Sequence, residues 1–245
     1  MRKLFSRFIF DYKKLSYDEI WGVVAVALRK YYPEDNNGWN FRTKRVKLDL
    51  VGKMFSQSFG EAHNQNFSIS IASDGSRYFS DLMIIMCESN MDFIDHIARS
   101  LVQYPEFIFG YVADKEFIDW QNASTPYSYI MAKKPHEHLP RIAGQVLGKD
   151  IFNERLDLSG NPGRTVFHMG YVEAICGVLY VTEKLTRLSG GDLHRLHDLP
   201  FLRIDDWLQC LRLELDPALL ANADQNPEMC SRMDSVRAVL FPPNK

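Results

Sequence analysis

A run of imidazoles and carboxylates between residues 191 and 198 has the residue types that could hold a divalent metal ion. It contains Asp192, His194, His197 and Asp198, and zinc and iron accept imidazole and carboxylate ligands. The spacing differs from the zincin pattern, in which two histidines and a glutamate share one helical face. Two hypotheses stay open: a metal-dependent hydrolase that uses this cluster, and a solvated turn that leads into a short helix.

An acidic stretch from Asp198 to Asp234 is the second candidate site, and it favours binding over catalysis. It holds eight acids and three arginines, a balance of −5 in a chain whose net charge is −2. The adjacent residues Asp205 and Asp206 would point away from each other on a strand or a helix. Their carboxylates are therefore poorly placed to act together on one bond of a substrate. We expect this stretch to bind a basic partner, with tryptophan as a possible anchor. The predicted partner-binding residues are Asp205, Asp206, Trp207, Arg212, Glu214 and Asp216.

Motifs for other chemistry are absent from the sequence. No G-x-S-x-G turn is present for a nucleophilic serine. The segment from Ser159 to Arg164 matches neither phosphate-binding glycine pattern, and its proline lacks a backbone donor. We therefore predict a protein that is not an enzyme, with no catalytic residues, no metal site and no cofactor.

The first part of the chain is basic. Residues 1–53 hold twelve lysines and arginines against six acids, and Arg42 to Lys47 could contact phosphates. A dedicated nucleic-acid binder usually carries a strongly basic domain, whereas this chain has a pI near 6.4. We expect no direct nucleic-acid partner.

The composition is that of an ordinary globular protein. The chain has 245 residues, of which 46% are hydrophobic and 24% charged, and this allows a large core. Its four cysteines form no C-x-x-C pair. The basic start meets Asp11 before the apolar region of a signal peptide can form, and no apolar run is long enough to span a membrane. We expect a cytoplasmic protein with no membrane partner.

Helices and strands are both predicted in the first half. Ser16 and Glu19 match a capping box, which predicts a helix from about residue 17 to Tyr32. Alternation over residues 67–71 and apolar runs over 82–87 and 107–112 predict strands, and the spacing over 91–104 predicts a helix. These elements indicate an α+β fold with a mixed, mainly antiparallel sheet and flanking helices.

The second half continues this pattern. Strands are predicted near residues 155–158, 174–181 and 209–215, with Leu213 on the inner face of the last strand and Arg212 and Glu214 on the outer face. Asn226 is expected to cap a helix that starts at Pro227. The proline-bounded segment 135–140 is a candidate boundary. The chain would then form one domain, 1–245, in which segment 135–140 could join two lobes, 1–134 and 141–245.

Several of these segments resemble a known family. Asp114 to Trp120, the region of Trp207, and Leu211 to Pro217 followed by the proline-capped helix look like immunity proteins of bacterial polymorphic-toxin and type VI secretion systems. The resemblance is to those paired with restriction-endonuclease-type toxins. It implies a cytoplasmic antitoxin that binds a cognate nuclease toxin and protects the producing bacterium. An acidic face could attract a basic nuclease cleft. A regulatory or scaffold module is the alternative, and the sequence sets no oligomeric state.

Overall fold

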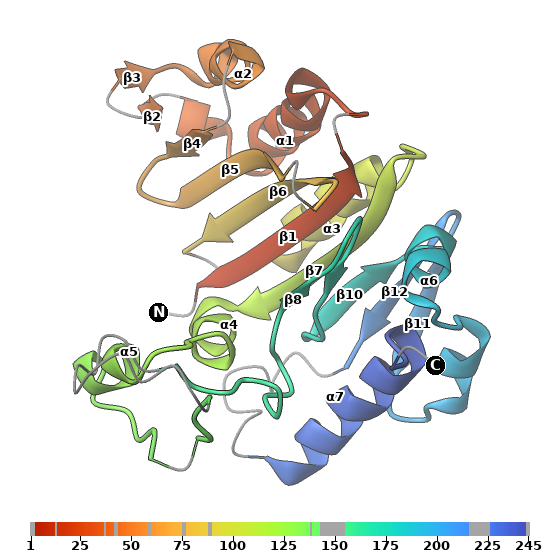
Figure 1. Ribbon diagram of the computed structural model, residues 1–245. Helices are drawn as coiled ribbons and strands as arrows, with labels where there is room; N and C mark the ends of the chain where they lie inside the picture. Colours follow the sequence, from red (N-terminus) through yellow and green to blue (C-terminus); the bar gives the residue numbers. More distant parts are fainter. Residues whose placement is uncertain are drawn as a thin grey trace.

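A computed structural model describes residues 3–12, 14–36, 38–41, 44–57, 60–74, 77–87, 90–137, 139–142, 155–215 and 226–243. Its strands form a ten-stranded sheet and a small two-stranded sheet (Figure 1). In spatial order the strands of the large sheet are β11 (Arg203–Trp207), β12 (Cys210–Glu214), β10 (Val178–Val181), β7 (Phe107–Asp114), β1 (Leu4–Asp11), β6 (Phe79–Met86), β5 (Phe67–Asp74), β4 (Gly60–His63), β2 (Trp39–Phe41) and β3 (Lys44–Val46). The small sheet pairs β8 (Val166–Phe167) with β9 (Val172–Glu173).

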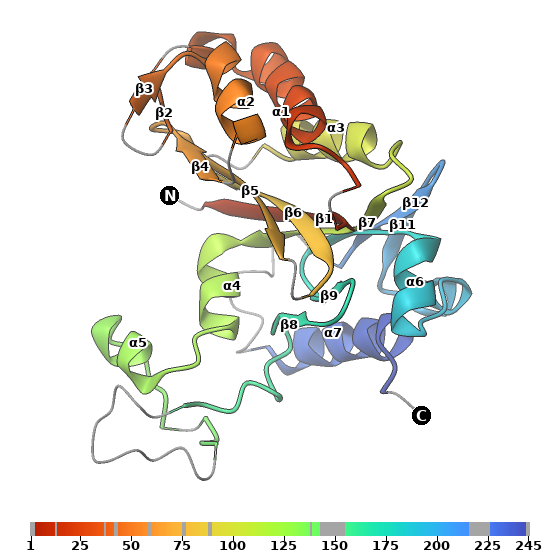
Figure 2. The same cartoon turned by 45° about the horizontal axis from the view of Figure 1, so that its top comes forward.

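Helices cover both faces of the large sheet. Figure 2 shows α1 (Tyr17–Tyr31), α2 (Leu48–Gln57) and α3 (Met91–Leu101) on one face. The other face carries α4 (Lys115–Gln121), α6 (Glu183–Ser189), α7 (Pro227–Leu240) and the small sheet. The remaining elements are α5 (Pro126–Met131) and two short 3-10 helices, η1 (Pro33–Asn36) and η2 (His194–Asp198). The predicted α+β class is confirmed, and the strand pairs between described residues are antiparallel.

The N-terminal segment forms a central strand, which the sequence patterns did not predict. β1 pairs with β6 on one side and with β7 on the other. Phe8 and Phe10 join the core under α1–α3, whereas Phe5 and Ile9 join the core on the α7 face. The strand is apolar on both faces because both faces of the sheet are covered.

Capping residues form the expected N-termini of two helices. Ser16 Oγ accepts a hydrogen bond from Glu19 N at 3.2 Å, and Ser16 N donates to the Glu19 carboxylate at 2.9 Å. Asn226 Oδ1 accepts from the backbone N–H groups of Glu228 and Met229 at the start of α7. Both predicted helices are confirmed, since each cap satisfies N–H groups that the first helical turn leaves free.

Three expected elements differ in extent. The predicted strand near 155–158 is reduced to an isolated bridge between Arg141 and Leu156. Within 174–181, only Val178–Val181 is a strand of the large sheet. Helix α3 ends at Leu101, three residues before the predicted end.

The proposed boundary at 135–140 remains a prediction. Strands from both sides of this segment share the large sheet, because β10 pairs with β7 over the register Val178↔Val112 to Val181↔Phe109. A continuous hydrogen-bonded ladder therefore joins the two halves of the chain.

Candidate functional site

The acidic residues singled out in the sequence lie on a β-hairpin at one edge of the large sheet. Strands β11 and β12 pair with Asp205 opposite Arg212 and Trp207 opposite Cys210. Leu208 and Gln209 form the turn between them. Cross-strand partners on one face of an antiparallel pair lie close enough for their side chains to interact, so the hairpin sets its charged residues against each other.

Arg212 is the centre of this arrangement. Its guanidinium contacts Glu214 at 2.8 Å, Asp95 of α3 at 3.0 Å and Asp205 at 3.4 Å. The Arg212 side chain is only 8% exposed, because α3 lies over this face. The sequence pattern had placed it on an outer, solvent-facing side. Burial opposes the charge of Arg212, but its hydrogen bonds with Glu214 and Asp95 raise its pKa above the ordinary value.

Tyr180 of β10 extends the network under α3. Its hydroxyl donates to Asp95 at 2.6 Å. Burial, followed by the adjacent Asp95 charge, raises the pKa of Tyr180 well above its ordinary value. The phenol therefore stays neutral and acts as a donor. Tyr180 of β10 and Arg212 of β12 thus hold Asp95 of α3, and Arg212 also holds Asp205 and Glu214.

Trp207 is buried, whereas the next residue is highly exposed. The Trp207 ring lies 5.5 Å from the Tyr180 ring and beneath the Arg99 guanidinium at 3.8 Å, and only 6% of the residue is exposed. Leu208 is 88% exposed at the tip of the hairpin. The sequence drew attention to the tryptophan and missed Leu208, because a Leu-Gln pair is not a usual hairpin-turn signal.

The other predicted residues have different environments. Asp205 and Glu214 are partly buried, with side chains 36% and 18% exposed, and Asp206 is exposed. Asp216 lies outside the described residues. The hairpin therefore brings five of the six predicted residues together, and their role in partner binding remains a prediction.

A pocket of about 400 Å³ lies beside the hairpin tip. Its lining combines Asp206 and Leu208 with residues of the loop after α3 and of helix α6, among them Tyr104, Lys184 and Arg187. Lys184 forms an ion pair with Asp11 at the end of β1. The tip, the pocket and α6 thus form a continuous surface at one end of the sheet.

The metal-site hypothesis is not supported by the geometry. Asp192, His194, His197 and Asp198 are all exposed, on and just before the short helix η2. Asp192 Oδ1 accepts a hydrogen bond from His194 N at 2.9 Å, as in a simple turn. Within the described ranges, no group of three or more His, Cys, Asp or Glu residues could hold a metal ion. The segment 191–198 therefore has the form that the second hypothesis describes, a solvated turn that leads into a short helix.

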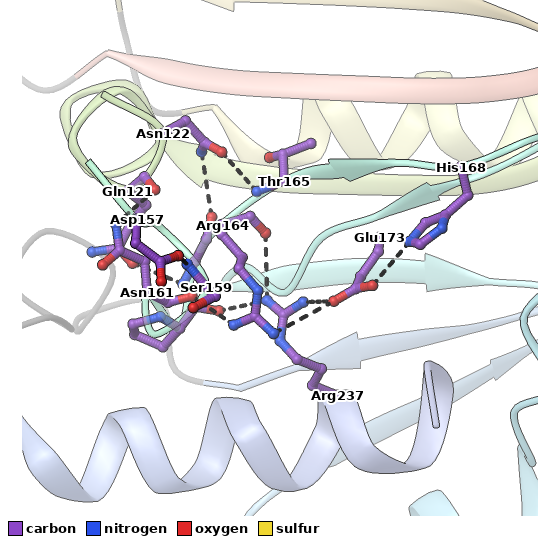
Figure 3. A network of polar contacts seen from close by, with 12 residues as sticks. Gln121, Asn122, Asp157, Ser159, Asn161, Arg164, Thr165, His168, Glu173 and Arg237 are labelled. Atoms are coloured by element: carbon purple, nitrogen blue, oxygen red, sulfur yellow. Dashed lines mark hydrogen bonds and ion pairs between the residues drawn. The ribbon is translucent and has the colours of Figure 1, made fainter. Parts of the chain in front are cut away.

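A second polar network fastens the segment around residues 157–173 to helices α4 and α7 (Figure 3). The buried Gln121 side chain accepts from Gly163 N at 2.8 Å, and Asn122 Oδ1 accepts from Thr165 N at 2.7 Å. Arg237 pairs with Glu173 and donates to the carbonyl oxygen of Pro162 at 2.8 Å. These bonds satisfy backbone groups that a loop inside the protein must pair, so the network has a structural explanation.

Comparison with known proteins shows a similarity of fold to a solved structure. No family model matches the chain, and no curated protein matches its sequence. Its structure is similar to that of the Pseudomonas aeruginosa T6SS protein PA0821, with a TM-score of 0.53. The two share 10% sequence identity over 100% of this chain and 77% of that one. At this identity the likeness shows the fold alone. Among the described helices, none is long and apolar enough to cross a membrane.

Proposed function

We propose that this protein is an immunity protein, a non-enzymatic inhibitor that binds a cognate toxin with a basic, nuclease-like surface. The observation that carries the proposal is the hairpin tip, where the 88%-exposed Leu208 stands beside the exposed Asp206. Protein-binding surfaces combine an apolar centre with a polar rim, and Leu208 beside Asp206 has that combination on a small scale. The fold likeness to a T6SS protein supports a connection with type VI secretion, the setting in which immunity proteins of this kind act.

Charge around the hairpin supports a basic partner. Three carboxylates surround the single guanidinium of Arg212. Arg203 lies 3.6 Å from Asp205 and 3.8 Å from Glu214, but its side chain is 69% exposed. Exposed ion pairs contribute little to the stability of a protein in water. A cationic group of the partner could therefore take the place of Arg203 beside these carboxylates with little loss of free energy. A nuclease that binds phosphates offers such lysine and arginine side chains.

The proposal is tested with the protein encoded by the neighbouring open reading frame. We expect that protein to be toxic when expressed alone, and we expect co-expression of this chain to restore growth and to yield a complex on a sizing column. Continued toxicity together with separate elution of the two proteins would refute the proposed function.

Charge reversal at the hairpin then tests the surface itself. Asp206→Lys should slow association by about threefold to tenfold at low salt, because complementary charge mainly accelerates encounter. The matched control is Asp49→Lys on α2, where the side chain is 75% exposed and far along the sheet. Stopped-flow association rates at two salt concentrations provide the measurement. Equal rates for both variants would exclude the hairpin from the interface.

A further inference from the structure

Two hairpin tips that are distant in sequence are tied together on the α7 face. Gly170, in the turn between β8 and β9, donates its N–H to the carbonyl oxygen of Arg77 at 2.6 Å, just before β6. The Phe167 ring stacks on Phe79 at 6.1 Å. Guanidinium groups of Arg7 and Arg77 each lie 4.9 Å from the Phe167 ring. These contacts hold the β8–β9 turn against the end of β6.

The joined tips and the neighbouring helix α6 carry four large apolar side chains that are exposed. Met169 is 60% exposed, Tyr78 58%, Leu188 of α6 44% and Phe167 38%. A Cβ atom on Gly170 would lie 3.9 Å from Leu188 Cδ2, which places α6 against the same turn. We name Tyr78, Phe167, Met169 and Leu188 the tip patch. Methionine and aromatic side chains beside arginine are enriched at protein interfaces.

The backbone at Tyr78 supports a role for this exposed side chain. Its φ is +57°, in the left-handed region that is unfavourable for a bulky residue. Such positions persist where the surroundings enforce them, and they gather at functional sites. A glycine would adopt this conformation without strain. The tip therefore keeps an aromatic residue, more than half exposed, where the backbone alone favours glycine.

The tip patch and the tip of the β11–β12 hairpin lie at the same end of the large sheet. The strand registers place Asp11 opposite Phe79 on one side and Val181 opposite Leu211 on the other. Four strand spacings separate β6 from β12, which amounts to about 19 Å. Helix α6 lies between the hairpin tip and the tip patch. Its Arg187 lines the pocket beside Leu208, and its Leu188 belongs to the tip patch and lies against Gly170.

This separation fits one protein–protein interface. A standard interface covers about 800 Å² on each partner, or about 30 Å across if it is round. One partner seated on this end of the sheet would therefore cover the hairpin tip with Asp206 and Leu208, helix α6 and the tip patch together.

We infer that the tip patch is the apolar half of the toxin-binding face, and that the toxin presents apolar side chains beside its basic surface. The inference rests on the proposed function. The acidic hairpin would accelerate encounter, whereas burial of the tip patch would slow dissociation, since most affinity within one interface is set by the dissociation rate. The toxin is favoured as the occupant because the tip patch continues, through α6, to the hairpin tip, where the exposed Asp206 can face a basic protein.

The test uses the full chain and the product of the neighbouring open reading frame made by cell-free synthesis. Met169→Glu should accelerate dissociation by about tenfold or more, with association changed by less than about threefold. Tyr78→Gly should also accelerate dissociation, while its melting temperature should stay equal to that of the wild type or rise. Val26→Glu is the matched control, because Val26 is 56% exposed on α1, on the other face of the sheet.

The outcomes separate the two proposals. Absence of any complex with the wild type refutes the proposed function. A wild-type complex whose dissociation rate is unchanged by Met169→Glu and Tyr78→Gly overturns the inference and leaves the proposed function standing. Sedimentation of the chain alone should show a monomer. If it shows a dimer, and Met169→Glu converts that dimer to monomers, the tip patch would bind a second copy of this chain and the inference would be overturned as well.

Discussion

Replacing Arg212 should show how strongly the charged network holds the hairpin. The Arg212 side chain is 8% exposed and contacts three carboxylates, whose side chains are 18–36% exposed. Removing one partner of a fully buried ion pair costs about 3–5 kcal/mol. Because these carboxylates reach water and can be rehydrated, we expect Arg212→Met to lower the free energy of unfolding by about 2–3 kcal/mol. For a chain of this size that is a fall of about 5–10 °C in melting temperature.

The matched control uses the same carboxylates. Arg203 lies near Asp205 and Glu214 but is 69% exposed, so Arg203→Met should cost less than about 0.5 kcal/mol. Urea unfolding at pH 7 measures both changes, and an unaltered m-value would show that the unfolded state is unaffected. A loss below about 1 kcal/mol for Arg212→Met, or equal losses for both variants, would refute the view that burial makes this arginine central.

Three further predictions concern local packing and protonation. Gly163→Ala should lower the free energy of unfolding by about 1–3 kcal/mol, because its Cβ would overlap side chains of α4, whereas Gly160→Ala meets open space and should be near neutral in the same urea titration. The hydrogen bonds of the capping box lower the pKa of Glu19 below 4.5. Its stabilising effect is thus present above that value and lost as pH falls through the lower, folded pKa, so unfolding curves of wild type and Glu19→Gln should converge in acid. Burial raises the pKa of Cys176 and Cys210 to about 12, and both thiols should therefore resist DTNB at pH 8 until the protein is unfolded.

The sequence by itself determined the features whose causes are local. The capping residues Ser16 and Asn226 satisfy N–H groups of the helices that they precede, so both helix starts could be predicted. Alternation identified the strand that became β12, and the α+β class followed from the mixture of patterns. None of these depends on which distant segment packs nearby.

Only the tertiary structure decided how the candidate site is arranged. Asp95 and Arg99 stand more than a hundred residues before Arg212 and Trp207, respectively, yet α3 covers both hairpin residues. No local pattern contains that pairing, because burial is a property of what packs against a strand. For the same reason Leu208, an ordinary leucine in the sequence, became the exposed tip. The tip patch likewise depends on two turns about 90 residues apart that meet only when the sheet is formed.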